Sequence, residues 1–182
     1  MIRAAALLLA LAPFAALAEG VEEPADYRHD DYRAPVPATI AGGVAVGPEA
    51  AHELWAAGVG FIDVMPRPPR PANLPERTIW RDKPRDTIPG AIWLPNVGYG
   101  AIAEETADYF RRGLEKATVG DKARPVVIFC LEDCWMSWNA AKRAIEWGYE
   151  AVRWMPEGTD GWALWDYPLE RAEPEEPQPG TG

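Results

Sequence analysis

The stretch from residue 125 to residue 147 constrains the fold more than any other part of the chain. It begins with Val126–Phe129, four consecutive apolar residues rich in β-branched side chains, which is typical of a buried strand. Cys130 follows directly, and regular apolar spacing after Ser137 predicts a helix. A cysteine between a strand and a helix N-terminus lies where backbone amides stabilise a thiolate. We therefore expect the rest of the chain to support this loop.

Similar strand and helix patterns alternate along the sequence. Strands are expected within residues 37–46, 59–64, 88–95 and 151–154, and helices within residues 48–57 and 103–117, with a short last helix near residue 162. This alternation predicts an α/β fold: a single domain over residues 40–170, with a mostly parallel central sheet and helices on both faces. Five prolines between Pro66 and Pro75 predict an extended loop insertion over residues 65–87.

Both ends of the sequence differ from this central pattern. Residues 1–18 combine Arg3, an apolar stretch and a small-residue site at 16–18, which predicts a signal peptide cleaved after Ala18 and a periplasmic location. Residues 19–39 are polar and aperiodic and predict an N-terminal arm, either a plain surface extension or a segment that docks a partner. Residues 171–182 are acidic and rich in proline and glycine, which predicts a disordered tail.

The charge of the chain limits its partners. The formal net charge is −10, which argues against binding to nucleic acid or to anionic membrane surfaces. The apolar stretch near the N-terminus is shorter than a membrane span requires, and no later stretch is longer, so no membrane span is expected.

Four short motifs, in order, resemble those of the rhodanese (sulfurtransferase-like) domain. They are Phe61-Ile-Asp-Val64, Ile88-Pro-Gly-Ala-Ile92, Val127-Ile-Phe-Cys130, and Gly148-Tyr149 followed by Gly158–Trp162. The resemblance implies that Cys130 carries a persulfide between a sulfur donor and an acceptor, with Asp63 in a supporting role.

A narrower resemblance comes from the Tyr-Arg-x-x-x-Tyr-Arg sequence at residues 27–33 and from Cys130-x-x-x-Cys134-Trp135. These motifs are similar to exported rhodanese-like "CXXCW motif" proteins associated with catabolism dependent on pyrroloquinoline quinone (PQQ). That similarity implies a role accessory to periplasmic quinoprotein alcohol dehydrogenase systems, and it leaves open whether PQQ itself binds.

The loop after Cys130 departs from the usual rhodanese pattern. Glycine and arginine are expected there, but this chain has the active-site loop residues Leu131, Glu132, Asp133, Trp135, Met136 and Ser137. Met65 and Thr87 also stand where the family usually has arginine and histidine. Because Glu132 and Asp133 oppose an incoming dianion, ordinary thiosulfate sulfurtransferase activity is not expected.

The second cysteine, Cys134, leaves three interpretations open. Cys130 and Cys134 could form a catalytic pair for thiol, persulfide or disulfide exchange, with Cys130 attacking and Cys134 resolving. They could instead form a structural disulfide, although so short a loop gains only about 2 kcal/mol from cross-linking. The third interpretation is a copper(I) carrier, because Cys130, Cys134 and Met136 offer soft sulfur ligands. A non-catalytic docking module is a further alternative.

Overall fold

The computed structural model describes residues 21–81 and 83–176. The predicted signal peptide at residues 1–18 and the end of the predicted tail at residues 177–182 lie outside this part of the chain. None of the helices within it is long and apolar enough to cross a membrane. The strands are β1 (Val44–Ala45), β2 (Gly60–Asp63), β3 (Arg85–Thr87), β4 (Ile92–Trp93), β5 (Val126–Phe129), β6 (Val152–Met155) and β7 (Glu170–Ala172). The helices are α1 (Pro48–Ala56), α2 (Glu104–Thr118), α3 (Trp135–Glu146) and α4 (Gly158–Leu164).

Five strands form the central sheet, in the order β1-β6-β5-β2-β4, and every neighbouring pair is parallel. β5 lies in the middle, with Ile128 opposite Ile62 of β2 on one side and Trp154 of β6 on the other. The predicted α/β class and the predicted parallel sheet are confirmed. β1 and β4 are shorter than the sequence pattern suggested, with two residues each.

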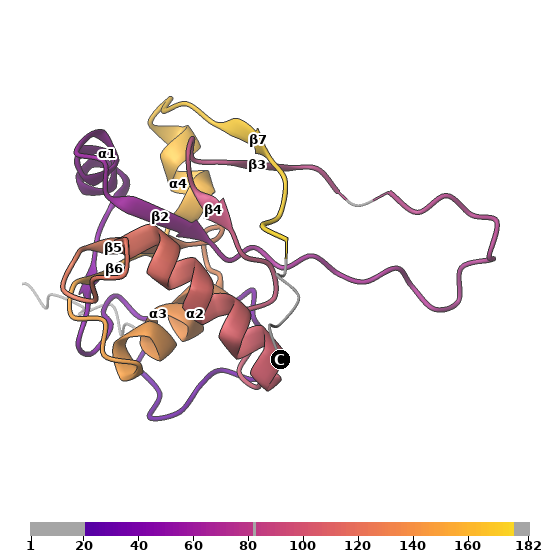
Figure 1. Cartoon of the computed structure of the whole chain (residues 1–182), viewed down its shortest axis with the longest axis horizontal. Coiled ribbons are helices and arrows are strands. Elements are labelled where there is room, and N and C mark those ends of the chain that lie inside the picture. The colour runs from indigo at the N-terminus through magenta and orange to yellow at the C-terminus, as the bar shows by residue number, and fades with distance from the viewer. Residues whose placement is uncertain (1–20, 82, 177–182) are drawn as a thin grey trace, which may run out of the picture.

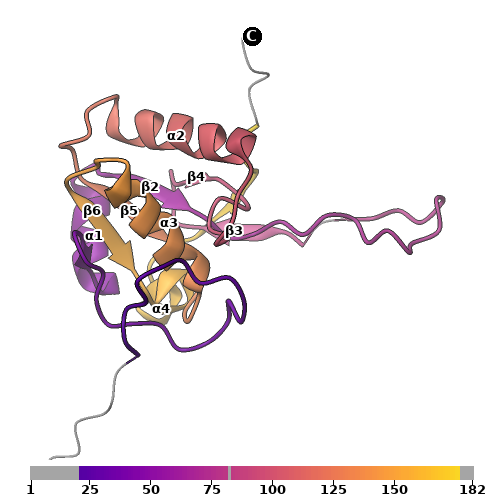
Figure 2. The same ribbon diagram turned by 90° about the horizontal axis from the view of Figure 1, so that it is seen from below.

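Helices cover both faces of the sheet, as predicted (Figure 1 and Figure 2). The face toward α2 and α3 carries the larger core, in which Val126 and Ile128 of β5 pack with Leu114 and Ala144. The opposite face packs on α1 and α4, and its core contains Val127, Phe129, Ala51 and Trp162. Successive β5 side chains thus enter opposite cores, which explains why this strand is apolar without interruption.

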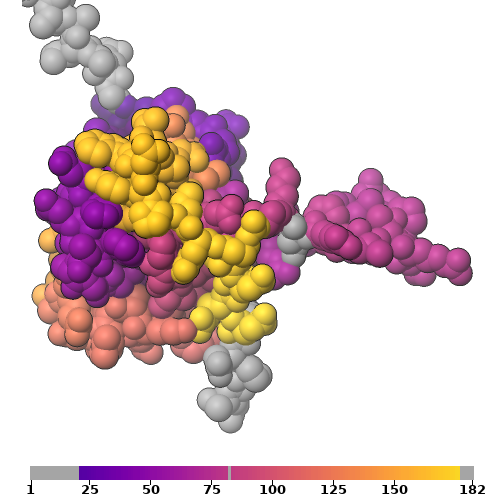
Figure 3. Space-filling model, turned by 90° about the horizontal axis from the view of Figure 1, so that it is seen from above, coloured from indigo at the N-terminus to yellow at the C-terminus, as the bar shows by residue number. Residues whose placement is uncertain are grey.

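The Pro-rich insertion leaves the domain between β2 and β3 as a long excursion (Figure 1 and Figure 3). Its stem is fixed at Arg67, whose backbone N–H donates to Asn96 Oδ1 at 3.1 Å. The last three residues of the predicted insertion, Arg85–Thr87, are not loop: they form β3, which pairs antiparallel with β7.

The predicted disordered tail is wrong for residues 171–176. Arg171 and Ala172 belong to β7, where Arg171 opposes Asp86 of β3. Glu175 then donates its backbone N–H to the Trp93 carbonyl at 2.9 Å and pairs with Lys116 at 2.8 Å. The order comes from backbone pairing with a distant strand, so the acidic composition of this segment gives no sign of it.

The N-terminal arm, described from residue 21 onward, is irregular and runs along α3 (Figure 2). Asn139 of α3 anchors it twice: Oδ1 accepts from the Arg28 N–H at 2.9 Å, and Nδ2 donates to the Arg28 carbonyl at 2.8 Å. Closer to the cysteines, Trp135 donates its backbone N–H to the Tyr32 carbonyl at 3.0 Å. The arm therefore lies against the helix that follows the cysteine loop.

Candidate dithiol site

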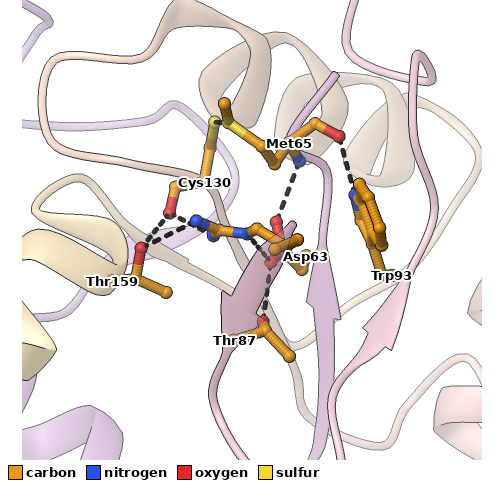
Figure 4. A network of polar contacts seen from close by, with 7 residues as sticks. Asp63, Met65, Thr87, Trp93, Cys130 and Thr159 are labelled. Atoms are coloured by element: carbon orange, nitrogen blue, oxygen red, sulfur yellow. Dashed lines mark hydrogen bonds and ion pairs between the residues drawn. The ribbon is translucent and has the colours of Figure 1, made fainter. Parts of the chain in front are cut away.

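The two cysteines lie at the carboxyl end of the parallel sheet. Cys130 follows β5 and Met65 follows β2, and the connections from these adjacent strands leave toward opposite edges of the sheet. Such a topological switch point is where open α/β sheets form ligand sites. Met65 Sδ is 3.7 Å from Cys130 Sγ (Figure 4).

Cys134 occupies the N-cap position of α3, with extended backbone angles of φ −113° and ψ 99°. Asp133, immediately before it, has a left-handed φ of 51°, a conformation that aspartate tolerates better than most residues. This turn brings the Cys134 sulfur back toward the Cys130 thiol and toward the amides of Met136 and Ser137. Both cysteines are free thiols in this structure.

The two thiols differ in acidity because their surroundings differ. Burial raises the pKa of Cys130 well above that of an ordinary thiol, and the neighbouring Cys134 and Asp63 charges act in the same direction. The hydrogen bond from Cys130, helped by the α3 amides, lowers the pKa of Cys134 to about 7. The pair therefore favours a thiolate on Cys134, with Cys130 as the protonated hydrogen-bond donor.

A buried ion pair lies directly below Cys130. Arg85 Nε is 2.7 Å from Asp63 Oδ2, and the same oxygen accepts from Thr87 Oγ1 at 2.6 Å (Figure 4). Arg85 also donates to the Cys130 carbonyl at 3.2 Å and to Thr159 Oγ1 at 3.1 Å. The arginine thus joins β2, β3, the cysteine loop and α4.

Sequence reasoning assigned Asp63 a supporting role and missed Arg85. The missed signal was the alternation in β3, where Arg85 and Thr87 are buried and Asp86 is exposed. Asp63 is fully buried, which raises its pKa, while the donors Arg85, Thr87 and the Met65 amide oppose that effect.

The other predicted loop residues have separate positions. Glu132 and Asp133 are exposed, and Leu131 is half-buried and forms an isolated β-bridge with Gly158. Trp135, Met136 and Ser137 are buried in the first turn of α3. Burial is the main cause of the raised Cys130 pKa, so the two exposed acids do not set it.

Two of these buried residues have clear structural partners. Ser137 Oγ donates to the Cys134 carbonyl at 2.8 Å and accepts from Trp154 Nε1 at 2.9 Å. Trp135 Nε1 donates to the Pro35 carbonyl at 3.1 Å, and its ring packs edge-on against Trp138. Both tryptophans serve packing of the arm and helix in this structure.

Both thiols are closed to solvent, with exposed fractions of 0% for Cys130 and 2% for Cys134. Met65 contacts Cys130, while the arm covers Cys134 through a bridge between Arg33 and Cys134. Chemistry at this pair therefore requires a movement of one of these two covers.

No group of three His, Cys, Asp or Glu side chains that could hold a metal occurs within residues 21–81 and 83–176. The sulfur atoms of Cys134 and Met65 both contact that of Cys130, and these three are soft donors. Met136, the third ligand expected from the sequence, is buried in the first turn of α3.

Comparison with known proteins identifies a similar solved structure. No protein-family model matches the chain, and a search of curated proteins found no match. Among solved structures, the chain is similar to the solution structure of the 30 kDa polysulfide-sulfur transferase homodimer from Wolinella succinogenes. The identity is 19% and the TM-score 0.46, and the match covers 71% of this chain and 80% of that one.

Proposed function

We propose that this chain is a rhodanese-like protein that performs thiol–disulfide or persulfide exchange at the Cys130–Cys134 pair. The observation that carries the proposal is the contact between the two thiols, in which Cys134 has a pKa lowered to about 7. An ordinary thiol with a pKa of about 8.5 is only about 3% ionised at pH 7, whereas a pKa of about 7 makes about half of it thiolate.

In disulfide exchange, the Cys134 thiolate attacks one sulfur of a disulfide, forms a mixed disulfide and releases the other sulfur as a thiolate. Cys130 then loses its proton to solvent and attacks the Cys134 sulfur, which releases the second substrate thiolate. The substrate disulfide is reduced by two electrons, and the protein is oxidised to the Cys130–Cys134 disulfide. These roles reverse the sequence-based prediction, in which Cys130 attacked and Cys134 resolved.

The same thiolate can accept a single sulfur atom. Attack on the outer sulfur of a persulfide donor forms a Cys134 persulfide and releases the donor as a thiolate. Glu132 and Asp133 remain exposed beside the pair, so a neutral or organic sulfur donor suits the loop better than the thiosulfate dianion.

Trapping the mixed disulfide with glutathione tests which of the two cysteines attacks. Reduced protein is treated with oxidised glutathione and examined by intact mass. The parent is expected to lose two hydrogen atoms as it forms the internal disulfide, whereas Cys130→Ser accumulates a glutathione adduct on Cys134. Cys134→Ser is expected to react at least tenfold more slowly. Equal rates for Cys134→Ser and the parent would overturn the assignment.

The location and pathway form a separate part of the proposal. The leader at residues 1–18 and the CXXCW-like motifs support export to the periplasm and a role accessory to PQQ-dependent alcohol oxidation. Fractionation with N-terminal sequencing tests export and is expected to find Glu19 as the first residue. Growth of Cys130→Ser and Cys134→Ser strains on PQQ-dependent alcohols tests the role, and growth equal to the parent would refute it.

A copper(I) carrier is the second candidate, and the contact between Met65 and Cys130 supports it. Met65 Sδ is 3.7 Å from Cys130 Sγ, so two buried thiols and one half-buried thioether offer sulfur donors of the kind that suits copper(I). Anaerobic copper(I) titration against a competing chelator is the test. Met65→Leu should weaken binding while Met136→Leu leaves it unchanged, and the absence of tight stoichiometric binding would exclude this candidate.

A further inference from the structure

A cavity of about 310 Å³ lies between the base of the Pro-rich loop and the carboxyl end of the sheet. Its volume is at the lower end of the range of small-molecule sites. Residues from both stems of the loop and from the segment around β4 line it, and those that bear on its chemistry are Met65, Arg67, Trp80, Lys83, Trp93 and Tyr99.

Three aromatic side chains form much of the wall. Trp93 is buried and fixed, because its Nε1 donates to the Met65 carbonyl at 2.7 Å. Tyr99 packs edge-on against Tyr32, which holds its ring in place. Trp80 reaches the cavity from the loop and is 38% exposed. Rings arranged in this way favour a ligand with a flat apolar body.

The charge of the lining is opposite to that of the whole chain. The described lining residues include Arg67, Lys83 and Arg85 and no carboxylate, whereas the chain has a formal net charge of −10. Arg85 is paired with Asp63, and the side chains of Arg67 and Lys83 add further positive charge to the lining. Local positive charge within an acidic protein raises the local concentration of small anions.

Both stems that carry these groups are fixed to the domain. Arg67 exchanges hydrogen bonds with Asn96 on the entering side, at 3.1 and 3.3 Å. On the returning side, Lys83 and Pro84 lead directly into β3, which pairs with β7. The cavity is therefore shaped before a ligand arrives, which reduces the entropic cost of binding.

We propose that this cavity binds a small organic anion with a flat aromatic body. Met65 forms one wall of the cavity and also contacts Cys130 Sγ, so a single side chain separates the bound molecule from Cys130. The site thus supplies a substrate class for the dithiol: anionic aromatic disulfides or persulfides. This last step rests on the proposed function, whereas binding itself does not.

A matched pair of fluorescent probes tests the binding. 8-Anilinonaphthalene-1-sulfonate carries the aromatic body with a negative charge, and N-phenyl-1-naphthylamine carries the same body without it. In the double variant Arg67→Gln/Lys83→Gln, the Kd for the sulfonate should rise at least tenfold, while that for the neutral probe changes less than twofold. Trp80→Ala should weaken both probes at least fivefold.

Arg77→Gln is the matched control, because Arg77 is a cation of the same loop outside the cavity lining. It should change neither Kd, and all variants should keep the parent melting temperature. Equal binding of the sulfonate by the parent and the double variant would overturn the site, as would equal losses in Arg77→Gln and the double variant. If probe binding behaves as expected but glutathione trapping fails, the cavity stands and only its link to the dithiol is lost.

Discussion

The hydrogen bond between the two thiols can be tested by comparing Cys130→Ala with Cys130→Ser. Serine keeps a hydroxyl that can donate to the Cys134 sulfur, whereas alanine removes the donor that contributes most to the lowered pKa of Cys134. A hydrogen bond to a charged group contributes roughly 1.5–3 kcal/mol, and one pKa unit corresponds to about 1.4 kcal/mol. The Cys134 pKa should therefore rise by about one unit or more in the alanine variant and stay near 7 in the serine variant.

The measurement is thiolate absorbance near 240 nm as a function of pH, on reduced protein without oxygen. Absorbance reports ionisation directly, so the burial of Cys134 does not distort the result as it would distort an alkylation rate. Cys134→Ser serves as the converse control: its remaining thiol, Cys130, should titrate above the ordinary range, because burial raises its pKa. The reasoning is refuted if Cys134 titrates at the same pH in the alanine and serine variants, or if Cys130 is the thiol that titrates near 7.

The remaining predictions concern stability and access. Because the pKa of Cys134 is lowered in the folded state, its ionisation stabilises that state fully above the pKa of the unfolded thiol, and this stabilisation is lost as the pH falls through about 7. The free energy of unfolding of Cys130→Ser in urea should therefore be about 2 kcal/mol larger at pH 9 than at pH 6.5. The difference should disappear when Cys134 is also replaced. Arg85→Met leaves the Asp63 carboxylate buried without its partner and should lower the free energy of unfolding by roughly 3–5 kcal/mol. The double variant Arg85→Met/Asp63→Asn should recover part of this loss. If the losses of the two single variants simply add in the double variant, the pairing is contradicted. Asn139→Ala removes an anchor of the arm and should raise the alkylation rate of Cys134 at least fivefold in protein that is still folded, although the lost bonds also lower its melting temperature; Lys116→Ala, on α2 away from the arm, should leave the alkylation rate unchanged.

The central fold could be predicted because its signals are local. Val126–Phe129 is apolar at every position, since both faces of β5 are covered, and Gly47–Pro48 marks the start of α1 as expected. The pairing of β3 with β7 could not be predicted, because it joins residues more than 80 positions apart without a strong apolar pattern in either strand. Backbone hydrogen bonds supply the specificity there, and they leave no trace in composition.

At the candidate site, too, features set by neighbouring residues could be predicted, whereas those set by contacts between distant residues could not. The order of strand, cysteine and helix predicted a thiolate at Cys130, whereas in the structure it is Cys134 whose pKa is lowered. This difference depends on depth of burial and on the turn at Asp133, which directs the second sulfur toward the helix amides. The Asp63 partner was missed because Arg85 reaches it from the end of the Pro-rich insertion, a segment expected to be loop throughout.

The two covers of the dithiol imply different routes to the two sulfurs. Met65 is one flexible side chain beside the cavity, so its displacement exposes Cys130 at small cost. Cys134 lies under the arm, held near this point by the Tyr32–Trp135 bond and the two Arg28–Asn139 bonds. At roughly 1 kcal/mol for each bond, breaking these three costs about 3 kcal/mol, and the Trp135–Pro35 bond adds to it, so Cys134 is exposed in fewer than about 1% of molecules. The better thiolate is thus the less accessible one, and arm opening, rather than ionisation, should limit the rate at which Cys134 reacts.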